Sequence, residues 1–98
     1  MEPRLVPIIQ DMSLRKYLKY LVEVFQVTRL EKLTPGEEIV FKLLPNQDFT
    51  LYYVGERPEK VLIDEQGLRA LVPSGMCILV FKRVENDASI EVAYSINN

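Results

Sequence analysis

Residues 76–84, which read MCILVFKRV, form the most continuously apolar stretch of the chain. The turn residues Pro73-Ser74-Gly75 precede this stretch and the polar residues Glu85-Asn86-Asp87 follow it. A strand with one face in water alternates apolar and polar side chains, whereas this stretch does not alternate. It therefore predicts a central strand that is buried on both faces or lies in the middle of a sandwich.

Shorter strand signals surround this run, separated by turn residues at the spacing typical of small sandwiches and barrels. The predicted strands cover residues 38–44, 49–54, 60–64, 68–72, 76–84 and 89–96. In the second of these, alternation places Phe49, Leu51 and Tyr53 on one face and Thr50, Tyr52 and Val54 on the other. In the last, we expect Ile90, Val92, Tyr94 and Ile96 to point inward and Glu91, Ala93 and Ser95 to point outward.

Residues 13–28 carry two competing patterns. Apolar residues recur at helical spacing after Ser13, a good N-cap, which favours an amphipathic helix. The β-branched and aromatic residues between Tyr20 and Thr28 favour a strand. We predict at most a short helical turn at 13–18, followed by a strand at 20–28, and keep a helix at about 13–27 as the alternative.

These elements predict a mainly β protein, a small antiparallel β-sandwich of immunoglobulin-like type with an extended N-terminal arm. The alternative is an α+β fold in which the helix at 13–27 packs on a six-stranded sheet or barrel. Because 98 residues suffice for one core only, we assign residues 1–12 to the arm and residues 13–98 to a single domain.

The arm is apolar and extended. Pro3 and Pro7 exclude a helix interior, and Leu5, Val6, Ile8 and Ile9 are its apolar side chains. Two interpretations remain open: the arm lies on its own domain as an edge segment, or it docks on a neighbouring subunit.

Charge and hydropathy narrow the choice of partners and of compartment. Residues 1–35 hold six basic and four acidic groups, a net +2, and residues 36–98 hold six and ten, a net −4. Such an acidic body disfavours nucleic acid as the main partner. The sequence contains neither a membrane-spanning apolar run nor a secretory signal pattern, so we expect synthesis in the cytosol without a signal peptide and no membrane association.

Residues 33–82 resemble bacterial immunoglobulin-like domains in their turns. The matching elements are Pro35-Gly36-Glu37, Pro45, Asp64-Glu65-Gln66-Gly67 and Ser74-Gly75 ahead of Ile78-Leu79-Val80. The chain departs from that family in lacking a tryptophan and in its added N-terminal segment. The resemblance implies adhesion, spacing or decoration work, including on virus particles.

The residue types exclude most catalytic chemistry. The chain has no histidine, which removes catalytic triads and histidine-based metal sites. Cys77 lies in the apolar run and is expected to be buried and inert. The carboxylate pairs Glu37/Glu38, Asp64/Glu65 and Glu85/Asp87 sit at polar turns, where capping is the expected role. We therefore predict a non-enzymatic protein without cofactor or metal.

Two surface clusters could meet a partner. Arg15, Lys16 and Lys19 lie beside Tyr17 and Tyr20, a pattern that single-stranded nucleic-acid binders use, although a solvated basic face explains it more simply. Tyr52 and Arg57 are of the types enriched in protein interfaces.

The sequence as a whole predicts a structural or assembly module that associates with itself or with another protein. Its predicted contact residues are Leu5, Val6, Ile8, Ile9, Tyr52 and Arg57. A capsid decoration or cement protein is the concrete version. The alternatives are an adaptor that binds a peptide by strand addition and, with less support, an OB-type binder of single-stranded nucleic acid.

Overall fold

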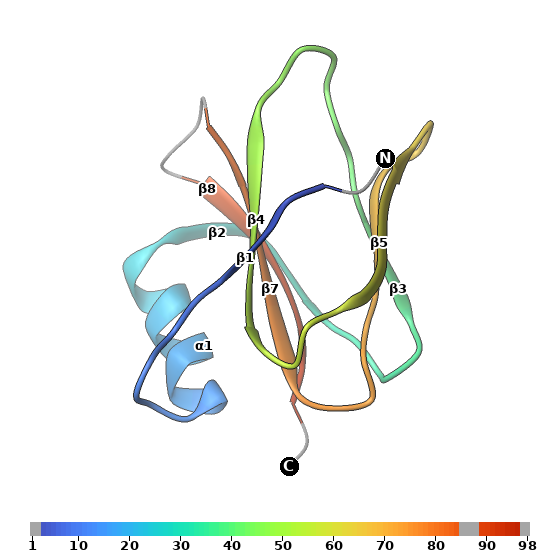
Figure 1. The fold of residues 1–98 in the computed structure, drawn as a ribbon. Coiled ribbons are helices and arrows are strands. Elements are labelled where there is room, and N and C mark those ends of the chain that lie inside the picture. The colour runs from blue at the N-terminus through green and yellow to red at the C-terminus, as the bar shows by residue number, and fades with distance from the viewer. Residues whose placement is uncertain (1–2, 85–88, 97–98) are drawn as a thin grey trace.

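The computed structural model describes residues 3–84 and 89–96, and these form eight strands and one helix (Figure 1). The elements are β1 (Leu5–Pro7), α1 (Leu14–Val24), β2 (Gln26–Lys32), β3 (Glu38–Phe41), β4 (Phe49–Gly55), β5 (Glu59–Asp64), β6 (Gly67–Leu71), β7 (Cys77–Arg83) and β8 (Ser89–Ser95). All six strands predicted after residue 36 are present, with ends that differ by no more than three residues. The predicted turn at 85–87 lies outside the described residues.

The strands form two sheets that pack face to face. The larger sheet has the order β1-β4-β7-β8-β2 and the smaller sheet the order β3-β6-β5. Helix α1 covers the other face of the larger sheet, so that the molecule has three layers (Figure 1). The prediction of a mainly β, small sandwich is confirmed.

Strand β7 lies at the centre of the larger sheet and contributes side chains to two hydrophobic cores, one on each face of the sheet. Its side chains alternate between the sheets and the helix: Leu79 and Phe81 pack in the core between the sheets, and Ile78 and Val80 pack in the core under α1. Residues 77–81 are all buried. A strand covered on both faces cannot alternate in polarity, which is why this run is apolar throughout.

A stack of phenylalanine rings fills the core between the sheets. The Phe81 ring lies between two others, with its centroid 4.9 Å from that of Phe41 and 5.4 Å from that of Phe49. Phe41 comes from the smaller sheet and Phe49 from β4 of the larger one. The stack therefore joins the two sheets directly.

An arginine–carboxylate network closes the sandwich beside this stack. The Glu91 carboxylate, with a side chain only 13% exposed, accepts hydrogen bonds from Arg83 at 2.6 Å and from Arg29 at 3.5 Å. The Arg29 guanidinium also donates to the carbonyl oxygen of Val40, at 2.7 Å, and so links β2 to β3 across the gap between the sheets. The network satisfies polar groups that the packing partly removes from water.

The sequence prediction for residues 13–28 is wrong in its details. Helix α1 runs through Leu14–Val24, and the strand begins only at Gln26. The Ser13 side chain accepts a hydrogen bond from the backbone N–H of Lys16, as an N-cap does. The apolar face of the helix buries Leu21 against the sheet, and this burial outweighs the modest cost of β-branched residues in a helix. The alternative was right about the helix and wrong about a single six-stranded sheet.

Each of the two edge strands of the larger sheet pairs in parallel with its neighbour, whereas the sequence predicted an antiparallel sandwich. Strand β1 pairs in parallel with β4, and β2 pairs in parallel with β8. These strands lie at opposite edges of the sheet, and α1 connects them across its face. A helical connection of this kind is what parallel edge strands require.

The predicted outward face of β8 is also buried. Ala93 packs in the core between the sheets, and Ser95 is buried. Ile90, Val92, Tyr94 and Ile96 pack on the helix side, as one face of an alternating strand should. Since the helix covers one face of this sheet and the smaller sheet covers the other, neither face of β8 is free.

Candidate functional site

The structure builds the N-terminal arm into its own sheet. Leu5, Val6 and Pro7 pair with residues 51–53 of β4, and the backbone N–H of Ile8 donates to the Tyr53 carbonyl oxygen at 2.9 Å. Leu5 packs against the core between the sheets and Ile8 against the core under α1. Of the four apolar arm residues, Ile9 is almost fully exposed to solvent, at 96%. The interpretation of the arm as an edge segment of its own domain describes this arrangement.

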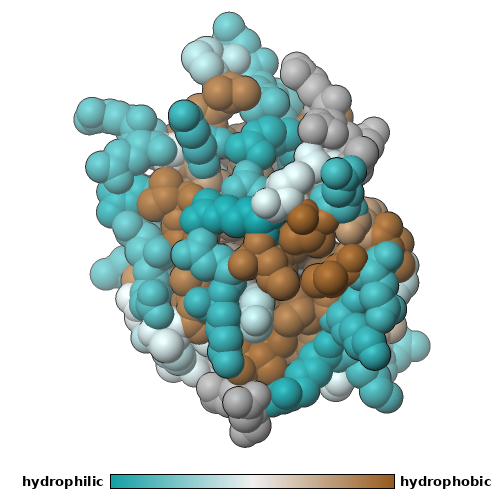
Figure 2. All heavy atoms as spheres, turned by 180° about the vertical axis from the view of Figure 1, so that it is seen from behind, coloured by the Kyte–Doolittle hydropathy of each residue, from teal (hydrophilic) through white to brown (hydrophobic). Residues whose placement is uncertain are grey.

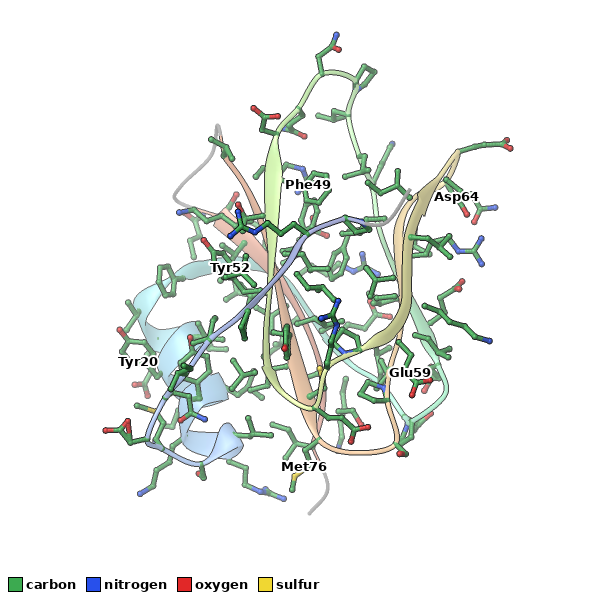
Figure 3. All side chains as sticks on the ribbon, viewed as in Figure 1. Tyr20, Phe49, Tyr52, Glu59, Asp64 and Met76 are labelled. Atoms are coloured by element: carbon green, nitrogen blue, oxygen red, sulfur yellow. The ribbon has the colours of Figure 1, made fainter. Side chains whose placement is uncertain are left out.

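Tyr52 and Arg57 are not brought together as one contact patch. Tyr52 lies on the helix side of β4, opposite to Phe49 on the same strand (Figure 3), and lines a small pocket beneath α1. Arg57 is exposed in the loop after β4. The small pocket has a volume of about 190 Å³, and Tyr17, Phe25 and Lys82 also line it.

A larger groove runs between α1 and the strands β2 and β8, and we call it the α1–β2 groove. Its volume is about 450 Å³. Its floor is apolar, formed by Leu18, Val22, Leu30, Tyr94 and Ile96, and its rim is charged, formed by Arg15, Lys19, Glu23 and Lys32. Figure 2 shows this side of the molecule, with apolar side chains gathered between rows of hydrophilic ones.

Secondary-structure periodicity places the groove residues. Leu18 and Val22 are four residues apart on α1 and therefore share one face of the helix. On β2 the register shifts between Val27 and Arg29, after which Leu30 faces the helix while Arg29 faces the smaller sheet. Val22 is 43% exposed and Leu30 is 48% exposed, so the groove leaves two large apolar side chains half in water.

The outer edge of β2 borders the groove and is a free strand edge. The backbone N–H of Leu33 donates to the carbonyl oxygen of Tyr94 at 2.8 Å, so odd-numbered residues of this stretch point their backbone groups toward β8. By alternation along the strand, the N–H and C=O groups of Leu30 and Lys32 point away from the sheet. They are ready-made partners for another strand.

Other edges among the described residues are less open to pairing. Strand β1 has three residues and ends in Pro7, and β3 has four residues. Strand β5 has a register shift after Glu59, and Lys60 there has a left-handed backbone with φ of 49°. Short strands, prolines and bulges all disfavour edge pairing. Strand β2 also has a register shift, between Val27 and Arg29, but residues 29–32 beyond it pair regularly with β8, and their outer edge borders the groove.

Three carboxylates of the predicted pairs, Glu37, Glu38 and Asp64, make contacts that hold the structure. Glu37 accepts hydrogen bonds from the backbone and hydroxyl groups of Thr34, which lower the pKa of its carboxyl. Arg69 bridges Glu38 on β3 and Asp64 on β5, at 2.7 and 2.8 Å. The backbone N–H of Gln66, followed by Arg69, lowers the pKa of Asp64, whose side chain is seen at the tip of the hairpin in Figure 3. Glu85 and Asp87 lie outside the described residues.

Two basic residues of the cluster on α1 lie on the other side of the helix from Tyr17. Arg15 and Lys19 line the α1–β2 groove, and Lys19 lies 3.9 Å from Glu23, four residues further along the helix. Tyr17 lines the small pocket under the helix, where burial and the neighbouring Tyr20 raise the pKa of its hydroxyl. The helix therefore separates these cations from the Tyr17 ring, whereas a base-stacking surface places them together.

Cys77 is buried between the sheets, where burial and, secondarily, the charge of Glu56 raise the pKa of its thiol to about 12. The reactive thiolate is then about a thousandfold rarer than for a free cysteine with a pKa of about 8.5. We expect the native protein to react with a chromogenic disulfide reagent at pH 8 far more slowly than the urea-unfolded chain. Release of one equivalent of chromophore at equal rates from both forms would contradict this expectation.

Neither a metal site nor a membrane span is found in the part of the chain that the structure describes. Clusters of three or more acidic, cysteine or histidine residues that could hold an ion are absent from residues 3–84 and 89–96. Helix α1 is too short and too polar to cross a bilayer. Among these residues, the α1–β2 groove combines half-exposed apolar side chains with a bordering strand edge.

Comparisons with known proteins give no relative for this chain. No protein-family description, no curated protein sequence and no solved structure matches it. The resemblance to bacterial immunoglobulin-like domains therefore stays a prediction from the turns.

The groove was not predicted from the sequence. The groove residues come from three elements, and they approach one another only when α1 and β2 dock. One local signal was present: Leu30 is the single apolar residue within the charged segment Arg29–Lys32 of an exposed strand.

Proposed function

We propose that this protein is a non-enzymatic assembly module that binds a protein partner at the α1–β2 groove and the adjoining edge of β2. The observation that carries the proposal is the coincidence, on one face, of half-exposed Val22 and Leu30 with outward-pointing backbone groups of a free strand. A partner strand on β2 would gain main-chain hydrogen bonds from the edge and side-chain burial from the groove.

We place the partner contact on this face, and not on the N-terminal arm as the sequence predicted, for a physical reason. Leu5 and Ile8 already pack their apolar surface against the two cores of their own domain. Releasing them to reach a neighbour would expose that surface and would also break the pairing of β1 with β4. Ile9 alone remains free for an additional contact at the N-terminal side.

The non-enzymatic character of the proposal rests on the residue types. The chain has no histidine, which is the commonest general base and activator of nucleophiles. The described carboxylate pairs cap turns or hold arginines, and the thiol is buried. Work on a virus particle, as a decoration or cement protein, is one setting for such a module and remains an expectation from the turn resemblance.

A photo-cross-linking amino acid placed at Val22 tests the proposal in cells that make the protein. We expect protein adducts of defined mass from this position. The matched control is the same amino acid at Leu62, which is 40% exposed on an edge strand of the other sheet and should give none. Equal labelling at both positions, or none at Val22, would refute the assignment of the binding face.

A further inference from the structure

We infer that the partner at the β2 edge is a second copy of this chain, bound by antiparallel pairing of β2 with β2 about a two-fold axis at Leu30. The inference rests on the proposed function, since it names the occupant of the same face. It is argued from the order of charges along the strand and from the direction of its backbone groups.

Within residues 29–32, the part of β2 that pairs regularly with β8, the charges select one symmetric register. In a two-fold antiparallel pair, one residue lies opposite its own copy. Centring the pair on Arg29, Glu31 or Lys32 places like charges opposite each other, which destabilises a sheet. Centring it on Leu30 places an apolar side chain against itself.

The same register pairs opposite charges on both sides of the axis. With Leu30 at the centre, Arg29 of each copy lies opposite Glu31 of the other. These two residues already face the same side of the sheet, with the Arg29 guanidinium 2.6 Å from the Glu31 carboxylate within one chain. Two copies would bring four alternating charges together at the junction, which favours this partner over an unrelated strand.

The backbone agrees with the charges. The N–H and C=O groups of Leu30 point away from β8, so the two Leu30 residues could exchange both of their hydrogen bonds. The adjacent Arg29 and Glu31 would then form non-hydrogen-bonded pairs, in which side chains lie closest together. Any offset by one residue would put opposing side chains on different faces of the joined sheet.

The groove gives the pairing an apolar contact as well. A two-fold axis perpendicular to the sheet places both copies of α1 on the same face, with the two α1–β2 grooves side by side. Leu30 and Val22 of each copy then lose contact with water against the other copy. The product is a continuous ten-stranded sheet, since each copy contributes five strands.

A cysteine at the proposed axis tests the geometry in the purified protein. Residues in a hydrogen-bonded antiparallel pair have Cα atoms about 5.5 Å apart, within the range that a disulfide spans. We expect Leu30→Cys to form a covalent dimer rapidly under mild oxidation, and the matched control Leu62→Cys to stay monomeric. The native Cys77 is buried and should not interfere.

Charge reversal tests the register. Glu31→Arg places arginine opposite Arg29 at both junctions, and we expect the dissociation constant measured by sedimentation to rise about tenfold or more. Glu31 is exposed and contacts Arg29 within the chain, so the fold should survive the change, which an unaltered circular dichroism spectrum would verify. Glu65→Arg, at the exposed turn between β5 and β6, is a control of equal charge change away from both the strand and the groove.

The outcomes separate this inference from the proposed function. A purified wild-type chain that sediments as a monomer at millimolar concentration, or a dimer that neither Leu30→Cys traps nor Glu31→Arg weakens, would overturn the second copy as partner. If Val22 then cross-links to a protein of another mass in cells, the binding face stands and the occupant is different. Absence of adducts from Val22 would refute the groove as the binding face, whereas a trapped Leu30→Cys dimer that Glu31→Arg weakens would still support the pairing of the two strand edges.

Discussion

Phe81→Ala is expected to lower the free energy of unfolding by about 3–5 kcal/mol, the range found when a buried phenylalanine is truncated. The Phe81 side chain is 1% exposed, lies between the rings of Phe41 and Phe49, and carries the Arg83 guanidinium 4.8 Å from its centroid. Its removal would leave a cavity between two sheets whose backbones are held by their own ladders and relax little. For a domain of ordinary stability, about 5–15 kcal/mol, the loss is a large fraction of the total.

Urea unfolding followed by far-ultraviolet circular dichroism measures this loss. Val84→Ala serves as the control, because Val84 is exposed just beyond the end of the same strand and its truncation should change stability by less than about 0.5 kcal/mol. A loss below about 1 kcal/mol for Phe81→Ala would show that the stacked rings do not join the two sheets in solution.

Gly67→Ala is expected to cost about 3 kcal/mol through the backbone rather than through a cavity. Gly67 begins β6 after a two-residue turn and has φ of 131°, a region that side chains rarely enter. A β-carbon there would also lie 2.4 Å from the carbonyl oxygen of Phe41 on the neighbouring strand. The hairpin of β5 and β6 would have to move away from β3.

Gly36→Ala separates the two causes of that cost. Gly36 also has a positive φ, of 90°, but a β-carbon at this position meets no atom within 4 Å. We expect Gly36→Ala to lose only the conformational part, about 1 kcal/mol. Equal losses for both variants in thermal unfolding would mean that the close approach to Phe41 is not maintained.

The strands after residue 36 could be predicted from the sequence because their signals are local. Turn residues such as Pro35, Gly36 and Gly67 mark where the chain reverses, and alternation within residues 49–54 assigns each side chain to a face. The unbroken apolar run at 76–84 predicted its own central position, since only a strand covered twice needs such a composition.

The helix and the edge pairings could not be predicted in the same way. The segment after Ser13 contains residues suited to both a helix and a strand, and the choice is made by the sheet surface on which Leu21 packs. The pairing of β2 with β8 joins residues such as Thr28 and Ile90, which are 62 positions apart. No local pattern names a partner at that distance.

The sequence suggested which types of residue would contact a partner, but it did not predict where on the molecule the candidate site lies. Leu5 and Ile8 of the arm pack against the cores of their own domain whereas Ile9 is exposed, and Tyr52 lines the pocket under the helix rather than a surface patch with Arg57. The α1–β2 groove depends on the docking of three elements, so its residues share no sequence motif. The one local signal for the groove was Leu30, an apolar residue among charged ones on an edge strand.

The pairing of an early strand with a late one also constrains how the molecule can be made. While a ribosome synthesises the chain, α1 and β2 emerge before the strand that β2 needs, and the apolar face of the helix emerges before β7 and β8, the strands it covers. The growing chain therefore carries an uncovered amphipathic segment until residues 89–95 are available. We expect this exposed segment to attract chaperones during that interval, and slowing translation beyond β2 should prolong its capture.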